Sequence, residues 1–357
     1  MFRLQDLGWD LFFANQQTEE EVRSFIPARV AEENRGFYRL YSERDELWTK
    51  LPGKVRHNSL NRAGLPAVGD WVLACKRVNE RCATIQRVLN RRNKFSRKTP
   101  GKKTEEQIIA ANIDTILLVS SLNREFNVRR IERYLTLVWE SGARPIIVLN
   151  KADACEDIES FRSHAESAGL GVAILVTSAA RGDGITDLKR IISVGGTTAL
   201  LGSSGVGKST LINALLGEDR QHTGEVRESG DRGRHTTTSR QLIVVPGGGV
   251  LIDTPGMREL QLWDSGAGLE HAFADVRELS TQCKFRDCRH LSEPGCAVRE
   301  AAESGTLDAE RLTSYHKLER EEQFLAAKQD DALRANRTKA LRRLMKEQKR
   351  LYRDRGR

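Results

Sequence analysis

A glycine-rich segment near the middle of the chain has the spacing of a phosphate-binding loop (P-loop). Residues 202–209 read Gly-Ser-Ser-Gly-Val-Gly-Lys-Ser and fit the pattern G-x-x-x-x-G-K-[ST]. The glycines let backbone N–H groups surround the phosphates, while Lys208 meets the β- and γ-phosphates and Ser209 binds Mg²⁺. The residues predicted to contact nucleotide in this segment are Gly202, Ser203, Ser204, Gly205, Val206, Gly207, Lys208, Ser209 and Thr210.

Two segments that follow the P-loop carry further candidates for magnesium binding. Asp253-Thr-Pro-Gly256 ends a short apolar run, and an acid at the carboxyl end of a strand can hold Mg²⁺ through water. Gly256 is placed for its backbone N–H to reach the γ-phosphate. In the polar segment 218–240, Thr237 is predicted to bind Mg²⁺, with Thr236 as the alternative. The predicted magnesium ligands are therefore Ser209, Thr237 and Asp253.

Motifs of this kind occur in enzymes that hydrolyse nucleotides, which need a residue to position or deprotonate water. Many of these enzymes place a glutamine directly after the glycine of DxxG, but here that residue is Met257. His235, in the polar segment before Asp253, is the best substitute and is the catalytic candidate. A surface histidine in a basic loop is an equally good interpretation of this residue.

A third group of motifs indicates which base is bound. Asn150-Lys-Ala-Asp153 follows an apolar run, and Asp153 can accept hydrogen bonds from N1–H and the exocyclic amine of guanine, a pairing that adenine cannot offer. Lys151 would stack over the ring, and Asn150 would tie neighbouring loops together. Ser178-Ala179 would supply a second guanine contact through a backbone N–H. The predicted ligand is therefore a guanine nucleotide, GTP or GDP.

These motifs occur in an unusual order along the chain. Most GTPase domains run P-loop, switch, DxxG, NKxD and SA, whereas here the NKxD motif at 150 and the SA motif at 178 precede the P-loop at 202. The same sheet can be built from a chain that is cut elsewhere, because termini lie at the surface and permutation is tolerated. Each motif follows a strand-like run, so the order predicts a circularly permuted GTPase domain.

A cluster of soft metal ligands lies in the last third of the chain. Cys283-x₄-Cys288-x-His290-x₅-Cys296 offers three thiolates and one imidazole, which is a full tetrahedral set for Zn²⁺. Four protein ligands leave no open coordination position, so we predict one structural Zn²⁺. Disulfides are not expected, because a chain of 357 residues can build its core without them.

The secondary structure predicted to position these residues differs between the first, middle and last parts of the chain. Strand-like and helix-like runs alternate between residues 113 and 252, which is typical of a doubly wound, mostly parallel sheet with helices on both faces. Before them, short runs of β-forming residues favour an OB-type barrel, a common scaffold for nucleic-acid binding. After residue 264 the sequence is polar and predicts helices.

We therefore predict a multidomain α/β protein. It would contain an N-terminal OB-type β-barrel, a circularly permuted P-loop GTPase domain and a C-terminal helical zinc-binding domain. The predicted bounds are 1–33 for an N-terminal extension, 34–100 for the barrel, 101–264 for the GTPase domain and 265–357 for the zinc-binding domain with its basic tail.

The net charge of +9 is unevenly distributed. Residues 334–357 are strongly basic, and a second basic stretch at 87–103 contains no acid. One interpretation is binding of a polyanion, since each neutralised phosphate releases counterions; the other is a pair of solvated surface segments. The sequence has no run typical of a membrane span or a signal peptide, so we expect a cytoplasmic protein that does not bind membranes.

From about residue 34 onward the sequence resembles the ribosome small subunit-dependent GTPase A family. The resemblance rests on NKAD, GSSGVGKS, RHTTT, DTPG and the C-x₄-C-x-H-x₅-C cluster, in that order. It implies binding to the small ribosomal subunit and its rRNA, GTP hydrolysis stimulated by that subunit, and a role in late subunit maturation. It also implies a histidine at the switch-one position of His235. For the oligomeric state we expect a monomer.

Two other functions are compatible with a guanine-nucleotide site. A GTP-dependent enzyme that acts on a small molecule or on tRNA would need a further catalytic constellation, and the flanking domains show none. A passive RNA-binding protein with a vestigial nucleotide site is disfavoured because the nucleotide motifs are intact. Stimulation of GTP turnover by small ribosomal subunits separates the first function from these two.

Overall fold

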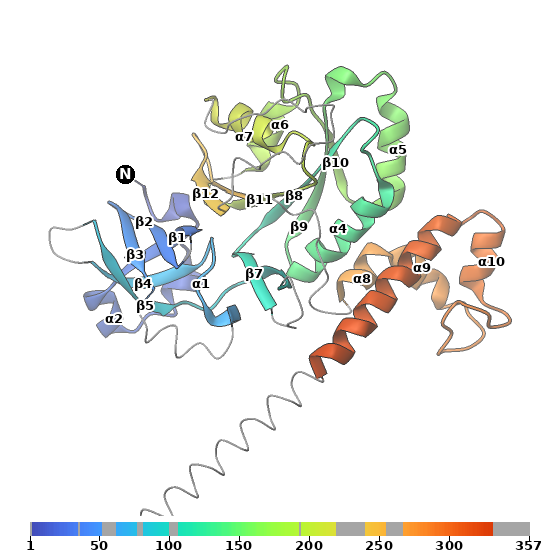
Figure 1. Cartoon of the computed structure of the whole chain (residues 1–357), viewed down its shortest axis with the longest axis horizontal. Helices are drawn as coiled ribbons and strands as arrows, with labels where there is room; N and C mark the ends of the chain where they lie inside the picture. The colour runs from blue at the N-terminus through green and yellow to red at the C-terminus, as the bar shows by residue number, and fades with distance from the viewer. Residues whose placement is uncertain are drawn as a thin grey trace, which may run out of the picture.

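The chain folds into a β-barrel, a central sheet flanked by helices, and a helical C-terminal segment (Figure 1). The computed structural model describes residues 2–34, 36–51, 62–76, 81–99, 106–192, 194–218, 240–254 and 267–330. Within these residues, no helix is long and apolar enough to cross a lipid bilayer. The succession of an all-β part, an α/β part and a helical part confirms the predicted fold class.

The central sheet is mostly parallel. Its parallel strands stand in the order β10-β9-β8-β11-β13, and β12 pairs antiparallel with β13. The carboxyl ends of parallel strands meet at one edge of a sheet, so the segments that follow these strands lie close together. The strands are β8 (Thr115–Ser121), β9 (Arg144–Asn150), β10 (Ala173–Val176), β11 (Thr197–Leu201), β12 (Arg240–Val244) and β13 (Val250–Asp253).

Helices cover both faces of this sheet. In β8, Leu118 packs into one apolar cluster with Leu135, while its neighbour Leu117 packs into a second cluster with Leu188. This alternation follows from the two-residue period of a strand, and it shows why a sheet buried on both faces reads as a continuous apolar run. The first face is covered by α4 (Val128–Ser141) and α5 (Ile158–Ala168), the second by α6 (Ile185–Ile191) and α7 (Lys208–Leu216).

The N-terminal barrel has five antiparallel strands in the order β3-β2-β1-β4-β5. A bridge between Trp48 and Cys82 and a hydrogen bond from the Trp48 N–H to the Arg81 carbonyl (2.8 Å) bring β3 and β5 together and close the barrel. This strand order is that of an OB-type barrel. The strands are β1 (Ile26–Asn34), β2 (Phe37–Ser42), β3 (Glu46–Lys50), β4 (Trp71–Lys76) and β5 (Ala83–Val88).

The barrel begins earlier in the chain than the predicted boundary at residue 34. β1 starts at Ile26 and lies at the centre of the barrel, because it pairs with both β2 and β4. The preceding residues also pack against the fold: Leu7 and Phe13 are fully buried in the same cluster as Trp71. They carry η1 (Gln5–Leu7), α1 (Leu11–Ala14) and α2 (Glu19–Ser24).

β1 also joins the barrel to the central sheet. Glu32 and Glu33 of β1 pair with Gln241 and Arg240 of β12, so the two sheets are continuous through this strand. A hairpin of β6 (Lys94–Lys98) and β7 (Glu106–Ala111) leads from the barrel into β8. The strand β12, which directly follows the polar segment that contains His235, is therefore fixed to the barrel.

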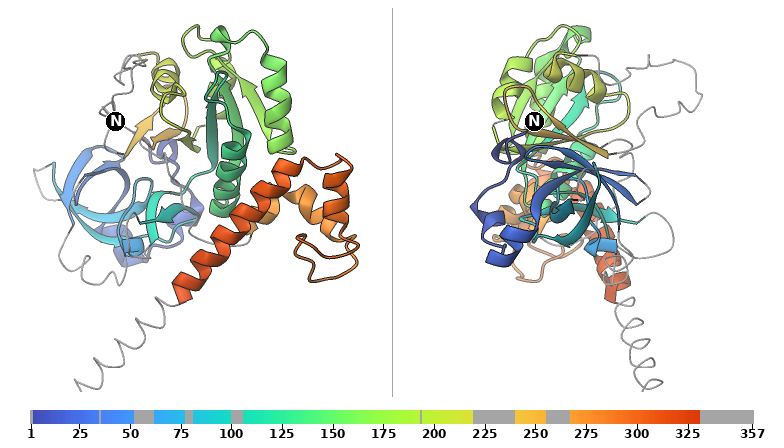
Figure 2. Two further views of the ribbon diagram at one scale, coloured as in Figure 1. Left: turned by 45° about the vertical axis from the view of Figure 1, so that its right-hand side comes forward. Right: turned by 90° about the vertical axis from the view of Figure 1, so that its left-hand side faces the viewer.

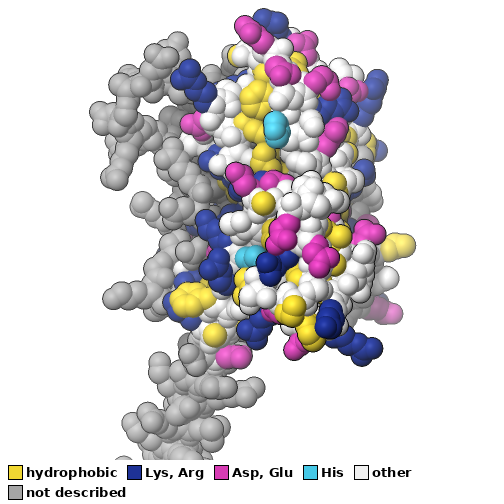
Figure 3. Space-filling view, turned by 90° about the vertical axis from the view of Figure 1, so that its right-hand side faces the viewer, with side chains coloured by type: hydrophobic (Ala, Val, Ile, Leu, Met, Phe, Trp, Pro, Cys, Tyr) yellow, Lys and Arg dark blue, Asp and Glu magenta, His cyan; other side chains and the backbone are white. Residues whose placement is uncertain are grey.

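The C-terminal segment packs against α4. It contains α8 (Ala267–Ala272), α9 (Ala274–Ser280), α10 (Ala297–Glu303) and a long helix at 309–330, which lies beside α4 (Figures 1 and 2). An ion pair of 2.6 Å between Arg133 and Glu321 connects α4 to the long helix. On the face formed by α5 and this segment, basic and acidic side chains are interspersed (Figure 3).

Candidate functional site

The P-loop connects β11 to α7, as the sequence predicts. β11 ends at Leu201, Ser204 and Gly205 lie in the following turn, and α7 begins at Lys208 after Gly207. Gly207 has a φ of 94°, and a Cβ atom there would lie 2.3 Å from Nδ2 of Asn150, so only glycine fits. Ser209 and Thr210 stand in the first turn of α7, whose free N–H groups favour an anion.

Lys208 and Asp253 place opposite charges at the P-loop. Nζ of Lys208 donates to the carbonyls of Gly202 (2.8 Å) and Ser203 (2.6 Å), which holds the ammonium group over the loop. Asp253 ends β13 and pairs in register with Leu200 of β11. Burial lowers the pKa of Lys208 to about 8 and raises the pKa of Asp253 to about 6, although their mutual attraction opposes both shifts. A phosphate beside the lysine and a cation beside the aspartate would stabilise both charged forms.

Asn150 connects the predicted guanine motifs to the P-loop. Its Nδ2 donates to the carbonyl of Val206 at 2.9 Å. Its Oδ1 accepts hydrogen bonds from the Thr177 hydroxyl at 3.2 Å and from the Ala179 N–H at 3.1 Å. The side chain is 1% exposed, so these bonds form away from water. The expected tie between the loops is therefore present, and it joins segments that are far apart in the sequence.

Asp153 and Ser178 meet at the edge of the same site. The Ser178 hydroxyl donates to Oδ1 of Asp153 at 2.6 Å, and this bond lowers the pKa of Asp153 below its usual value. The Asp153 carboxylate is exposed and remains available as an acceptor. Lys151 has a φ of 67°, in the left-handed region, which marks a sharp turn after β9. The Ala179 N–H, predicted to contact guanine, binds Asn150 in this structure.

Four residues that the sequence analysis singled out lie outside the described residues: His235, Thr236, Thr237 and Gly256. Their predicted roles in magnesium binding, water activation and γ-phosphate contact stay predictions. The described part of the site therefore contains the P-loop, Asp253, and both guanine motifs.

Arg130 is a neighbour of the P-loop that the sequence did not point to. It stands in the first turn of α4, and its Nη1 donates to the hydroxyl of Ser203 at 3.2 Å. No motif marks this residue, because the contact depends on how α4 packs against β8 and β9 and so brings its first turn to the P-loop. Only the tertiary structure brings the two segments together.

The three cysteines and the histidine of the C-terminal cluster come together as predicted. Their ligand atoms all lie within 4.8 Å of one another. Sγ of Cys283 is 3.9 Å from Sγ of Cys296 and 3.6 Å from Nδ1 of His290. Bond lengths of about 2.3 Å to sulfur and 2.0 Å to nitrogen around a tetrahedral Zn²⁺ give ligand separations of roughly 3.5–3.8 Å. The set of Cys283, Cys288, His290 and Cys296 therefore fits a Zn²⁺ ion.

Comparison with known proteins identifies the family. The sequence model of the RsgA GTPase family matches residues 88–263. A small ribosomal subunit biogenesis GTPase RsgA from Opitutus terrae is 46% identical, and the match covers 92% of each chain. The chain belongs to the RsgA GTPase family. An RsgA 2 protein from Vibrio parahaemolyticus is 45% identical over 91% of this chain and 87% of its own.

Two solved structures show the same architecture as this RsgA family member. YjeQ from Thermotoga maritima superposes with a TM-score of 0.62 at 29% identity, covering 84% of this chain and 99% of that one. YloQ, described as a circularly permuted GTPase, has a TM-score of 0.60 at 26% identity and covers 86% and 98%. The chain is therefore a GTPase with the permuted motif order, and its family implies Mg²⁺ as a partner of the nucleotide.

Proposed function

We propose that this GTPase binds the small ribosomal subunit during its late maturation and that the subunit stimulates hydrolysis of GTP to GDP and phosphate. The relatives named as small ribosomal subunit biogenesis GTPases match nearly the whole chain, which supports the same partner here. The observation that carries the nucleotide-binding part of this proposal is the side chain of Asn150. It bonds to both the Val206 carbonyl and the Ala179 N–H, so the two permuted halves share one site.

In this site, guanine would be recognised at the edge formed by Asp153 and Ser178. Asp153 would accept both N–H groups of the base, and its Ser178 hydrogen bond keeps it ionised and oriented. Lys151 would stack over the ring. Ala179 would exchange its present bond to Asn150 for one to the base, or share its N–H between them.

The triphosphate would lie in the P-loop between β11 and α7. Backbone N–H groups from Gly202 to Thr210 would surround the phosphates, and Lys208 is already held at two loop carbonyls close to the phosphate position. Magnesium would be bound by Ser209, by Asp253 through water and by Thr237. These residues would hold the ion in position, and Mg²⁺ bound there would supply charge neutralisation for the phosphate oxygens during hydrolysis.

His235 would position or deprotonate the attacking water, and Gly256 would contact the γ-phosphate. The family resemblance supports the role of His235, since it implies a histidine at this switch-one position. Met257 stands where many GTPases have the glutamine that orients water, so another residue must do this. A histidine has an ordinary pKa close to neutrality and can accept a proton from water at physiological pH.

The zinc ion would be structural. Cys283, Cys288, His290 and Cys296 supply four ligands, which completes a tetrahedral shell and leaves no position for water or substrate. Its position between α9 and α10 suits an ion that holds the loop 281–296 in shape beside those helices.

We propose that rRNA is contacted by the basic tail rather than by the basic stretch at 87–103. Within that stretch most described basic side chains have acidic partners elsewhere in the fold. The pairs are Arg87–Glu21, Arg91–Asp70, Arg92–Asp114 and Lys94–Glu106. The charge of the described part of this stretch is therefore largely paired with carboxylates of the same chain. Residues 334–357 carry a similar excess of positive charge and lie outside the described residues.

Sedimentation through a sucrose cushion tests the partner. The chain is mixed with small subunits, or with large subunits as the control, in the presence of a non-hydrolysable GTP analogue or GDP. We expect it to pellet with small subunits alone, and more completely with the GTP analogue. Pelleting that is equal with both subunits, or absent with both, would contradict the proposal.

A further inference from the structure

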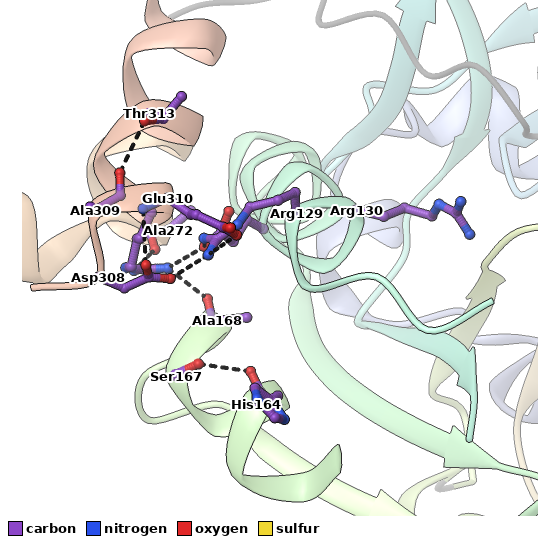
Figure 4. Close-up of polar contacts among 12 residues, drawn as sticks. Arg129, Arg130, His164, Ser167, Ala168, Ala272, Asp308, Ala309, Glu310 and Thr313 are labelled. Carbon is purple, nitrogen blue, oxygen red and sulfur yellow. Dashed lines mark hydrogen bonds and ion pairs between the residues drawn. The ribbon is translucent and has the colours of Figure 1, made fainter. Parts of the chain in front are cut away.

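Helix α4 carries arginines that face in two directions. Arg129 forms ion pairs with Asp308 and with the buried Glu132, and Arg133 forms an ion pair of 2.6 Å with Glu321. Figure 4 shows Arg129 reaching toward the C-terminal segment, whereas Arg130 extends from the other side of the helix. Two of these three arginines are therefore paired with carboxylates, and the third is directed elsewhere.

Arg130 is directed at the P-loop. Its Nη1 lies 3.2 Å from the Ser203 hydroxyl, and its other hydrogen bond, to the Glu125 carbonyl, is weak at 3.5 Å. Among the residues that the structure describes, no carboxylate forms an ion pair with it. The Asn127 side chain accepts the Arg130 N–H at 2.9 Å and caps α4, which fixes the backbone from which the guanidinium extends.

Ser203 is contacted by two cations from different elements. Nζ of Lys208 binds its carbonyl at 2.6 Å, and Arg130 binds its hydroxyl. Since Lys208 is the residue that meets the β- and γ-phosphates in a P-loop, Ser203 lies at that end of the site. A partly buried guanidinium without a carboxylate partner is a strong source of positive potential, because low local dielectric weakens its screening.

We infer that Arg130 is a positioning residue of the nucleotide site: it holds Ser203 in place and adds positive charge beside the β- and γ-phosphates. This inference rests on the proposed nucleotide site. It predicts that Arg130 strengthens binding of GTP more than binding of GDP, because GTP carries one more phosphate at this end. A residue that only ordered the loop would strengthen both nucleotides equally.

Isothermal titration calorimetry on the full chain with Mg²⁺ tests the inference. The dissociation constants of GTPγS and GDP are measured for the wild type, Arg130→Ala, Arg130→Lys and Arg144→Ala. We expect Arg130→Ala to weaken GTPγS about tenfold, as for the loss of one charge-assisted interaction, and GDP by about twofold to threefold. Arg130→Lys keeps the charge and restores most of the preference for GTPγS.

Arg144→Ala is the matched control, because Arg144 is exposed and begins β9 at the opposite edge of the sheet from the P-loop. It removes the same charge and is expected to leave both dissociation constants unchanged. Equal weakening of both nucleotides by Arg130→Ala, or no weakening of either, overturns the inference. Circular dichroism and zinc content, unchanged in Arg130→Ala, exclude misfolding as the cause of a loss.

Binding measurements on Lys208→Ala distinguish a failure of this inference from a failure of the proposed nucleotide site. If Lys208→Ala abolishes binding of GTPγS while Arg130→Ala leaves it unchanged, the P-loop is the nucleotide site and the role of Arg130 is wrong. If Lys208→Ala also binds both nucleotides normally, the proposed site is wrong, and the inference falls with it.

Discussion

At the scale of single residues, Asn150 connects the permuted motifs most directly. Its amide donates to the P-loop carbonyl of Val206, and its oxygen accepts from Thr177 and Ala179. A buried carboxamide with both ends bonded fixes three loops relative to one another. The proposed guanine edge of the site is therefore held in place without nucleotide, which would lower the entropy lost on binding.

Asp153→Asn changes which base fits this edge. Asparagine offers one acceptor and one donor in place of two acceptors, which suits N1–H and O2 of xanthine rather than the two donors of guanine. We expect the GTP dissociation constant to rise by at least about a hundredfold and XTP to bind instead. Calorimetry with both nucleotides measures the exchange. Unchanged GTP affinity would show that guanine is not read by Asp153.

His235→Ala tests the assignment of the water-activating residue. We expect the kcat for GTP hydrolysis to fall by about a hundredfold, as for loss of a general base, with GTP affinity unchanged. Single-turnover hydrolysis and equilibrium binding of a GTP analogue measure the two quantities separately. An unaltered kcat would leave His235 as a surface histidine, which the sequence allows equally well.

The sequence predicts a site residue when a local motif marks it, and misses a residue whose contact forms only in the tertiary structure. The P-loop, Asn150 and the Cys/His cluster were predictable, because the residue types and spacing of a local segment carry that chemistry. Arg130 was not, because its contact with Ser203 joins helices and loops that are distant in the sequence. The ion pairs of the stretch 87–103 could not be predicted for the same reason, because their acidic partners, such as Glu21 and Asp70, come from other parts of the chain.

At the scale of elements, α4 is the support on which the C-terminal segment rests. Arg311 of the long helix is 4% exposed and pairs with Glu132 of α4 at 3.1 Å and with Asp275 of α9 at 2.7 Å. Burial raises the pKa of Glu132, while Arg129 and Arg311 oppose the shift. The charges in this network depend on one another, because each would be costly to bury alone.

Arg311→Ala leaves the buried Glu132 without this partner. We expect it to lower the free energy of unfolding by about 3 kcal/mol, measured by urea titration of tryptophan fluorescence. Replacing both partners, as Glu132→Leu with Arg311→Met, is expected to cost less than Arg311→Ala, since less charge stays unpaired. The exposed Arg320→Ala is the control. Equal, small losses in all three variants would show that the network does not hold the segment.

The strands that were hardest to predict from the sequence are those of the barrel. The α/β region was predictable because each strand is a continuous apolar run followed by a periodic helix, as in β8 and α4. β1 was not, because its sequence, Ile-Pro-Ala-Arg-Val-Ala-Glu-Glu-Asn, is mixed in character. It is a strand because β2, β4 and β12 all pair with it.

At the scale of the whole molecule, we expect the segment that carries the Cys/His cluster to depend on a metal. Native mass spectrometry is expected to find one Zn²⁺ per chain, and Cys283→Ala is expected to reduce this to none. Without the ion, the loop 281–296 would lose the proposed ligand bonds, so we expect its backbone amides to exchange faster with solvent. A folded, metal-free wild-type protein with unchanged amide exchange would contradict the structural role of zinc.

The GTPase domain is joined to the barrel on one side and to the C-terminal segment on the other. β12 follows the segment of His235 and pairs with the barrel, while α4 lies beside the P-loop and holds the C-terminal segment. The GTPase domain therefore contacts both of its flanking parts through elements next to the nucleotide site.

The most direct test of the central claim is phosphate release from GTP, measured with and without purified small ribosomal subunits, with ATP and large subunits as controls. We expect slow release from GTP alone, at least about a tenfold increase in kcat with small subunits, and no release from ATP. Release from GTP that is equally slow with and without small subunits would contradict the account.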